Sequence, residues 1–237
     1  MKLSLINARS IKNKLQELHY YLSNNAPDIL CITETWLTSA VTNVVLVGDC
    51  DYTVFRKDRT DAVGGGVCIL LNNKTVVGTQ VNIPSIFSHL ELVAADISTS
   101  LTKVRLFIGY RPPSSDKDST AVAYAKDMCS CISNLSRSNY TTLVCGDFNF
   151  PSIQWNDNSA NNCDNESCSG LFYNFCVTNS LHQLVQDATR LTSSTSNVLD
   201  LILCNDLNFV FNVNVTTPFS SCDHCIVNCN LQYNTGI

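Results

Sequence analysis

The sequence predicts an α/β fold in which two β-sheets pack face to face and helices cover their outer surfaces. Short apolar runs recur along the 237 residues, and a few helical segments lie between them. The runs at 65–71, 90–97 and 103–110 follow one another without an intervening helix, which favours antiparallel pairing. A two-sheet sandwich flanked by helices therefore fits the pattern better than a wholly parallel sheet.

The apolar runs are predicted to be strands, because they are short and bounded by turn-forming residues. They cover 3–6, 28–33, 66–71, 90–97, 104–110, 141–145, 199–204 and 225–231. Apolar residues at 11, 15, 18 and 22 are spaced to share one face of a helix, with Ser10 as its N-cap. A second helix is expected over 121–135, after Ser119, and a weaker third from about 167 to 180.

Length and composition exclude several classes of protein. A chain of 237 residues with 45% hydrophobic residues can form a single domain, residues 1–237, without disulfides to stabilise it. Its apolar runs are shorter than the ~20 residues of a membrane span, and its N-terminus does not resemble a secretory signal. Thirteen cysteines in irregular spacing indicate reduced thiols. We therefore expect a nuclear or cytoplasmic protein that does not interact with membranes.

The balance of charge gives a weak indication about the ligand. A net charge of −5 argues mildly against strong non-specific binding to DNA, for which basic domains are usual. Local basic patches remain open, because 56–59, Lys12, Lys14 and Arg111 could share one face.

Polar residues recur at the ends of the predicted strands. They are Asn7, Glu34, Tyr110, Asp147, Asn149, Asp200, Asp223 and His224. Strand ends are rigid supports that can direct side chains into a shared cleft. Carboxylate and amide oxygens suit hard cations such as magnesium. A magnesium ion can polarise a phosphoryl oxygen while a carboxylate or histidine activates water.

Each of these residues also has a structural explanation. Asn7 could cap a helix or turn, and residues 147–149 could simply form a turn. Asp200 is harder to explain in this way, since a carboxylate inside an apolar strand needs a partner. His224 is a natural partner, because a buried Asp200 would orient its ring and keep it protonated.

A zinc site is the alternative reading of the same region. Residues 222–225 contain the spacing C-x-x-C, which zinc sites favour. A structural zinc site would need a second pair of ligands, for which Cys163 and Cys168 are the loose candidates.

The motifs INARSI, ITETW, GGG, GYRPP, GDFN, ATR…LDLIL and CDH occur in this order. The sequence in this respect resembles the endonuclease domain of LINE-type (non-LTR) retrotransposons. That group belongs to the endonuclease/exonuclease/phosphatase superfamily, with apurinic endonucleases and DNase I. The resemblance runs from about Leu3 to Leu231. GDFN is moderately specific to the superfamily, whereas the contexts of GYRPP and LDLIL narrow it to the retrotransposon group.

The resemblance implies a four-layered α/β sandwich, DNase I-like, with two mixed sheets flanked by helices. It also implies a magnesium-dependent endonuclease that nicks target DNA and leaves a 3′-hydroxyl, with manganese as a substitute metal. In such elements the endonuclease precedes a reverse transcriptase, a domain that these 237 residues do not include. Two alternatives stay open: a non-catalytic nucleic-acid-binding remnant, and a phosphatase or phosphodiesterase of another branch of the superfamily.

The resemblance implies roles for residues that match its motifs. The metal ligands would be Asn7, Glu34 and Asp223. The catalytic residues would be Tyr110, Asp147, Asn149, Asp200 and His224. The residues that bind substrate would be Thr189 and Arg111. The stretch 191–198 resembles the hairpin loop that reads DNA shape at the target site.

The resemblance assigns each catalytic residue its own step. Asp147 would position or deprotonate the attacking water, and Asn149 would orient that water. Asp200 would pair with His224, which would bind the phosphate and stabilise charge in the transition state. Tyr110 would contact the scissile phosphate.

One residue departs from the family pattern. Cys222 lies where the family usually has serine, directly before Asp223 and His224. A thiol is a weaker hydrogen-bond donor than a hydroxyl. Reduced activity is therefore one expected consequence of this substitution, although all the charged catalytic positions are present.

Overall fold

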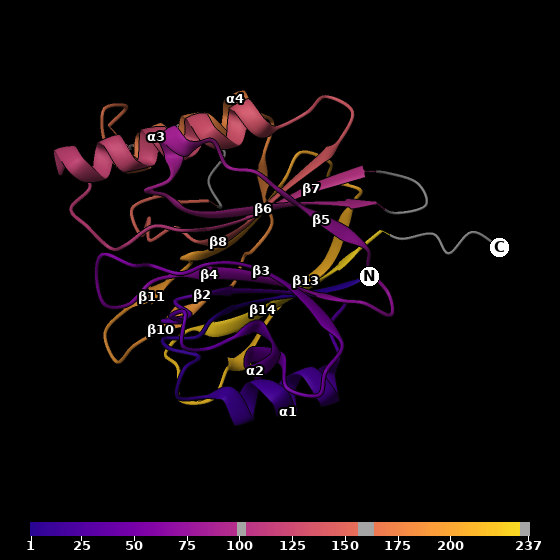
Figure 1. The fold of residues 1–237 in the computed structure, drawn as a ribbon. Coiled ribbons are helices and arrows are strands. Elements are labelled where there is room, and N and C mark those ends of the chain that lie inside the picture. Colours follow the sequence, from indigo (N-terminus) through magenta and orange to yellow (C-terminus); the bar gives the residue numbers. More distant parts are fainter. Residues whose placement is uncertain (99–102, 156–163, 233–237) are drawn as a thin grey trace.

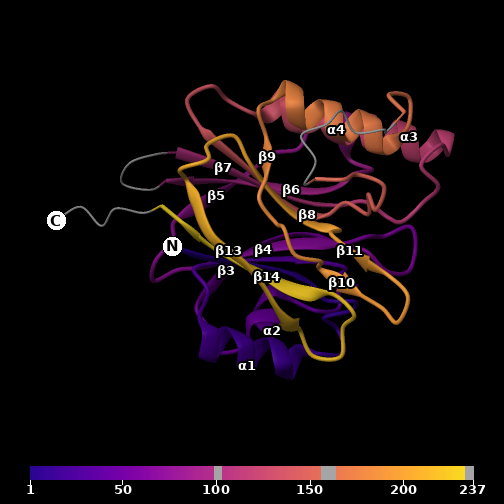
Figure 2. The same ribbon diagram turned by 180° about the vertical axis from the view of Figure 1, so that it is seen from behind.

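The computed structural model describes residues 1–98, 103–155 and 164–232. Two six-stranded sheets pack face to face, and helices cover both outer surfaces (Figure 1). From one outer surface to the other, the layers are helices, the first sheet, the second sheet and helices, as the view from behind also shows (Figure 2). The four-layered α/β sandwich predicted from the sequence is therefore confirmed.

The first sheet joins the two ends of the chain. Its order is β13-β14-β1-β2-β4-β3, and its strands are β1 (Lys2–Asn7), β2 (Ile29–Thr33), β3 (Tyr52–Lys57), β4 (Val67–Asn72), β13 (Val210–Pro218) and β14 (Cys225–Leu231). Only β1 and β2 pair in parallel, and the other neighbours are antiparallel. The carboxyl ends of β1 and β2 consequently lie side by side, with Asn7 opposite Thr33.

The second sheet is built in the same way from the middle of the chain. Its order is β5-β6-β7-β8-β12-β9, and its strands are β5 (Gly78–Val81), β6 (Glu91–Ser98), β7 (Lys103–Tyr110), β8 (Thr141–Asp147), β9 (His182–Gln183) and β12 (Asp200–Cys204). Its one parallel pair, β7 and β8, places Tyr110 beside Asp147. Because β12 runs antiparallel to β8, the first residue of β12, Asp200, lies directly opposite Asp147.

The helices and a small hairpin complete the fold. They are α1 (Leu15–Asn25), α2 (Asn43–Val47), the 3-10 helix η1 (Ser85–Phe87), α3 (Ser119–Leu135), α4 (Cys168–Thr178) and the hairpin of β10 (Arg190–Leu191) with β11 (Ser196–Asn197). Helices α1 and α2 cover the first sheet, and α3 and α4 cover the second. Both views show this hairpin at one end of the sandwich, away from the two chain termini (Figures 1 and 2).

Side chains alternate between the two faces of each strand, so each sheet contributes to two cores. The central core between the sheets contains Leu5, Ile69 and Ile108, among others. One outer core packs α1 against the first sheet, and the other packs α3 and α4 against the second around Phe107 and Phe172. Within the described parts of the chain, no helix is long and apolar enough to cross a membrane. The cysteines described there are all free.

The predicted N-cap at Ser10 is wrong. Helix α1 begins at Leu15, and Ser10 is buried in the preceding loop with a positive φ of 81°. The backbone N–H of Ser10 donates to the carbonyl of Glu34 at 2.8 Å, and that of Ile11 donates to Thr35. The loop after β1 therefore extends over the end of β2 before the helix starts, and this backbone pairing takes priority over capping.

Glycine at position 146 allows β8 to pack closely against β7. Its φ is +150°, and a Cβ at this position would overlap the carbonyl oxygen of Gly109 on β7. We expect Gly146→Ala to lower the free energy of unfolding by about 3 kcal/mol, since neither backbone can move without breaking the ladder. Urea denaturation measures the loss. Gly109→Ala should cost less, because its Cβ would meet the side chain of Phe148 at 3.1 Å; equal losses would contradict this account.

Candidate active site

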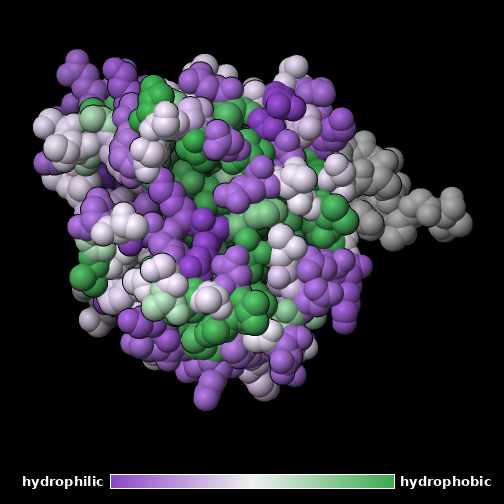
Figure 3. Space-filling model, in the orientation of Figure 1, coloured by the Kyte–Doolittle hydropathy of each residue, from purple (hydrophilic) through white to green (hydrophobic). Residues whose placement is uncertain are grey.

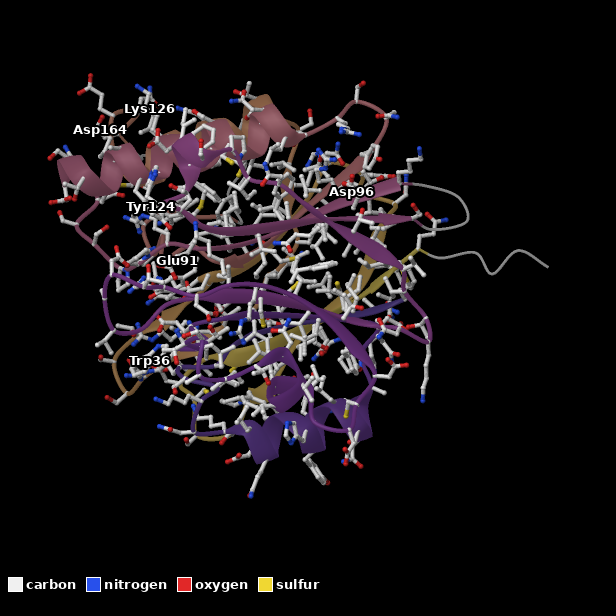
Figure 4. The ribbon with its side chains drawn as sticks, in the orientation of Figure 1. Trp36, Glu91, Asp96, Tyr124, Lys126 and Asp164 are labelled. Carbon is white, nitrogen blue, oxygen red and sulfur yellow. The ribbon has the colours of Figure 1, made fainter. Side chains whose placement is uncertain are left out.

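Strand ends from both sheets meet at one cleft of about 210 Å³. The residues that line it are Asn7, Arg9, Glu34, Trp36, Tyr110, Pro113, Asp147, Asn149, Arg190, Asp223 and His224. The structure thus brings together most of the residues predicted from strand ends. Figure 4 labels Trp36 and Glu91, which lie at this end of the sandwich, and hydrophilic side chains are prominent there in Figure 3.

Two buried carboxylates face each other at the base of the cleft. Asp147 and Asp200 are paired across β8 and β12, and each is only 1% exposed. Asp147 accepts hydrogen bonds from the side-chain amide of Asn7 at 2.8 Å and from the backbone N–H of Asn149 at 3.1 Å. Burial and the charge of Asp200 raise the pKa of Asp147 despite these contacts. Like charges opposed in a sheet are unfavourable, so this pair calls for a nearby positive charge.

His224 supplies part of that charge. Its Nδ1 lies 2.7 Å from Oδ2 of Asp200, and the ring is 5% exposed. Burial alone would lower the pKa of His224, but the hydrogen bond and charge of Asp200 outweigh it, and the net pKa is raised from 6.5. The ring is therefore oriented with Nδ1 toward Asp200 and is favoured in its protonated form.

A strained turn after β2 presents Glu34. Glu34 and Trp36 both have φ of +54°, a conformation that non-glycine residues seldom adopt. The Glu34 carboxylate accepts hydrogen bonds from the indole N–H of Trp36 and from the backbone N–H of Gly65, the latter at 3.3 Å. The backbone N–H of Trp36 in turn donates to the carbonyl of Gly65 at 2.8 Å. The GGG motif thus holds Glu34 in place, in a manner typical of strain at functional sites.

Tyr110 also lines the cleft and lies close to Glu34. Burial raises the pKa of its hydroxyl well above 10.0, and the adjacent carboxylates of Glu34 and Asp147 raise it further. The hydroxyl therefore stays protonated and can donate a hydrogen bond to an anion in the cleft.

Asp223 lies between two arginines at the mouth of the cleft. Its carboxylate is 3.1 Å from Arg9 and 2.9 Å from Arg190. Burial would raise the pKa of Asp223, but Arg190, His224 and Arg9 outweigh it and lower the pKa. Asp223 is thus ionised, and a metal ion would compete with these guanidinium groups for it.

Thr189 and Arg111, for which contact with substrate is predicted, are not among the residues that line the cleft. The hydroxyl of Thr189 is fully buried and accepts the backbone N–H groups of Leu199 and Asp200, both at 3.0 Å. Arg111 is 2% exposed and donates to the carbonyl of Asn149 at 2.9 Å. Both side chains are used to position the loops that carry Asp200 and Asn149.

Sequence reasoning left four lining residues without a role. They are Arg9, Trp36, Pro113 and Arg190, which lie within the motifs INARSI, ITETW, GYRPP and ATR. The signal available in the sequence was that each lies within a few residues of one to which the motifs assign a role. A side chain adjacent to a strand-end ligand can reach the same cleft when the backbone turns sharply, as it does at Arg9 and Trp36.

The donor set of the cleft fits a hard divalent cation. Glu34, Asp147 and the Asn7 amide offer oxygens, and the buried Oδ1 of Asp200 lacks a hydrogen-bond partner. Ligand atoms of Asp147, Asp200 and His224 lie within 4.8 Å of one another. Oxygen-rich sites with few nitrogens suit magnesium or manganese better than zinc.

Among the described candidates for the alternative zinc site, Cys168, Cys222 and Cys225 form no cluster of potential metal ligands. Across residues 1–98, 103–155 and 164–232, the one cluster of three potential metal ligands is Asp147, Asp200 and His224. Cys222 and Cys225 do not belong to it. Cys163 lies outside the described residues.

The predicted basic patch at 56–59 is largely neutralised. Arg56 pairs with Asp58 at 3.1 Å, and Arg59 forms a buried ion pair with Glu91. Lys14 donates to the carbonyl of Ala8 at 2.7 Å. These cations stabilise the fold around the cleft.

The thiol of Cys222 takes part in two hydrogen bonds. Its thiol donates to the carbonyl of Ala8 at 3.0 Å and accepts from Lys14 at 3.2 Å. Burial raises the pKa of Cys222, so the thiol is protonated and available as a donor. The loop before His224 is thereby tied to the residue that follows Asn7.

The motif resemblance implies DNA nicking, and we expect Cys222→Ser to change the rate of that activity by no more than about threefold, because thiol and hydroxyl hydrogen bonds differ by less than about 1 kcal/mol here. Cys222→Ala removes the contact and should lower the free energy of unfolding by about 1 kcal/mol. Plasmid nicking and urea denaturation measure the two effects. Cys50→Ser controls for the loss of a thiol far from the cleft. A large gain for Cys222→Ser would mean that the thiol impairs the site.

A model of the endonuclease–reverse transcriptase family matches residues 104–228, which is more than half of the chain. The chain belongs to this family. This confirms the resemblance inferred from the motifs. The matched residues of this endonuclease–reverse transcriptase family member include Tyr110, Asp147, Asp200 and His224. No curated protein matches the sequence.

Solved structures confirm that this family member has the DNase I-like nuclease fold. The endonuclease domain of TRAS1, a telomere-specific non-LTR retrotransposon, is 17% identical, with a TM-score of 0.73 over 98% of this chain and 97% of that one. A 3′ phosphatase from Neisseria bound to a product DNA hairpin is 16% identical, with a TM-score of 0.78 over 98% and 100%. An AP endonuclease from Archaeoglobus fulgidus is 15% identical, with a TM-score of 0.74 over 98% and 99%.

Proposed function

We propose that this chain is a magnesium-dependent DNA endonuclease, with residues 1–237 acting as one domain, that nicks one strand and leaves a 3′-hydroxyl. The observation that carries the proposal is the cleft itself. Two facing carboxylates, a buried Asp–His pair and Glu34 from the other sheet converge within about 210 Å³. A cleft of this size can hold one phosphate group and its metal.

Asp147 and Asn149 would act on the attacking water. The Asp147 carboxylate accepts the water proton as the oxygen attacks phosphorus. Asn149 orients the same water through its side chain. Its backbone N–H donates to Asp147, and this hydrogen bond fixes the position of Asn149 relative to the Asp147 carboxylate. The bond from phosphorus to the 3′ oxygen breaks, and the departing oxygen takes up a proton from solvent, which yields the 3′-hydroxyl and a 5′-phosphate.

His224 and Tyr110 would bind the phosphate. Nδ1 of His224 is bound to Asp200, so Nε2 is the nitrogen directed at substrate. A protonated ring donates to a phosphate oxygen and stabilises the negative charge that grows in the transition state. The Tyr110 hydroxyl donates from the other side.

Glu34, Asn7 and Asp223 would hold the metal ion, with Glu34 as the main ligand. When bound, magnesium or manganese neutralises phosphate charge and polarises the phosphoryl oxygen. Holding Glu34 in a strained turn keeps one carboxylate available for this purpose, and the GGG loop maintains that turn.

DNA is the proposed substrate, and the hairpin of β10 and β11 is the proposed reader of its shape. The hairpin lies beside His224, since Arg190 forms a β-bridge with that residue. Leu191 in the hairpin is 54% exposed and could contact a groove of the duplex. A reverse transcriptase domain is the proposed functional partner, because the 3′-hydroxyl would serve as its primer.

Nicking of supercoiled plasmid tests the proposal. We expect relaxed circles with magnesium or manganese, none with EDTA, and nicks that a DNA polymerase extends without further processing. Folded protein that binds DNA in EDTA and never nicks would establish the non-catalytic remnant instead. Release of inorganic phosphate from 3′-phosphorylated DNA or inositol phosphates, with no nicking, would indicate another branch of the superfamily.

A further inference from the structure

A second and larger cavity adjoins the cleft. It has a volume of about 660 Å³, and its lining includes Lys12, Asn13, Trp36, Thr38, Arg59 and Val63. Trp36 is the one residue that lines both cavities, so its indole forms the wall between them. The cleft, at about 210 Å³, is smaller than the roughly 300–1,000 Å³ of typical ligand pockets. A nucleotide that flanks the scissile phosphate must therefore extend beyond the cleft.

We propose that this cavity binds an unpaired nucleotide of the DNA strand, next to the scissile phosphate, with its base stacked on Trp36. The inference rests on the proposed endonuclease function and adds a structural preference to it. A base within a duplex has both faces covered by its neighbours. Only a base that has left the stack can place a face on the indole.

The indole of Trp36 is partly exposed and is held in a fixed orientation, as stacking requires. It is 38% exposed, yet its N–H donates to Glu34 and its backbone N–H donates to Gly65. The ring also lies against Gly64, where an added Cβ would come within 3.5 Å of Nε1. A side chain fixed in this way loses little freedom on binding. Stacking on aromatic side chains is tolerant of sequence, because every base has a π-face.

The charge of the cavity suits one backbone phosphate. Within the described parts of the chain, Lys12 has no ion-pair partner, whereas Arg59 is paired with Glu91 and Asp58 with Arg56. Lys12 is exposed and lies on the loop after β1. Its ammonium is consequently available for the phosphate of the unpaired nucleotide, while Asn13 and Thr38 offer hydrogen bonds to the base.

The test uses duplexes with a single bulged 2-aminopurine, whose fluorescence falls when the base stacks on an indole. Binding is measured in EDTA, so that it does not depend on nicking. We expect wild-type protein to change the fluorescence of the bulged base. Trp36→Ala should abolish that change and weaken binding of bulged over paired DNA by roughly tenfold. Trp36→Phe should keep the preference for bulged DNA. Tyr20→Ala, which removes an exposed aromatic side chain on α1, should behave as wild type.

With magnesium, nicks should concentrate at a phosphodiester bond beside the bulge, and this preference should disappear in Trp36→Ala. Nicking of paired and bulged DNA at equal rates, with no fluorescence change, would overturn the cavity assignment and leave the endonuclease proposal intact. A fluorescence change lost in Trp36→Ala, in protein that never nicks, would support the cavity and contradict the endonuclease. A fluorescence change that survives in Trp36→Ala would also overturn the assignment.

Discussion

Asp147→Asn is expected to reduce the rate of plasmid nicking by about 10³-fold, because an amide cannot accept the proton of the attacking water. The same change should make the protein more stable. The raised pKa of Asp147 means that ionising it disfavours the folded state at every pH above its ordinary value of 3.8. Removing that carboxylate should therefore raise the free energy of unfolding at pH 7 by about 1–2 kcal/mol.

The opposite signs of the two effects make this prediction specific. Nicking is followed with magnesium, and urea denaturation is followed in EDTA so that a bound metal does not stabilise the wild type. Asp206→Asn, on the loop after β12, is the matched control and should leave both quantities unchanged. A variant that loses activity and stability together would show that Asp147 is structural.

Asp200→Asn should reduce nicking at pH 7.5 by about 10³-fold, a magnitude typical of groups that orient a catalytic histidine. In the wild type, Asp200 outweighs the effect of burial and raises the pKa of His224 above 6.5. Without that charge, burial should dominate and lower the pKa of His224. The ring would then be neutral at pH 7.5 and could no longer donate through Nε2.

The pH dependence of stability and of nicking tests whether Asp200 acts through the charge of His224. The raised pKa of His224 contributes stability below about pH 6.5, and this is lost as pH rises through the pKa of the folded state. In Asp200→Asn that dependence should reverse, because a lowered pKa of His224 makes the protein lose stability as pH falls through about 6.5. The loss in nicking should become smaller as pH falls toward 6. NMR titration of the histidines in metal-free protein measures the pKa directly. A loss of nicking that is the same at every pH would argue against this role.

A second Asp–His pair provides the matched control. Asp127 on α3 contacts His89 at 3.2 Å, and both side chains are about half exposed, at 46% and 47%. Neither residue lines the cleft. Asp127→Asn should change neither the nicking rate nor the titration of His224, because solvent screens an exposed pair.

Strands in the interior of the sheets were predictable from sequence, and strands at the edges were not. The runs that became β1, β2, β4, β6, β7, β8, β12 and β14 are apolar because these strands are buried on both faces. Strands β3, β5 and β13 lie at sheet edges and are only partly buried. Their polar residues break the apolar pattern, so pairing with a neighbour, rather than composition, defines them.

The candidate site divides in a similar way. Residue type and strand-end position identified Asn7, Glu34, Asp147, Asp200 and His224, because carboxylate, amide and imidazole groups have few structural uses at such places. The burial of Thr189 and Arg111 was not predictable from these features. Thr189 is fully buried beneath β12, and sequence motifs do not distinguish a residue that binds substrate from one that supports its neighbour.

The sequence by itself determined that strand ends carrying oxygen ligands would converge, and GDFN was one part of that pattern. Only the tertiary structure decided which groups touch. Asn7 reaches Asp147 across 140 residues of chain, and Asp200 faces Asp147 through a strand pairing. Trp36 became the wall between two cavities through its turn against the GGG loop. Such contacts join segments far apart in the chain, and their geometry depends on sheet order and register, which local residue patterns do not encode.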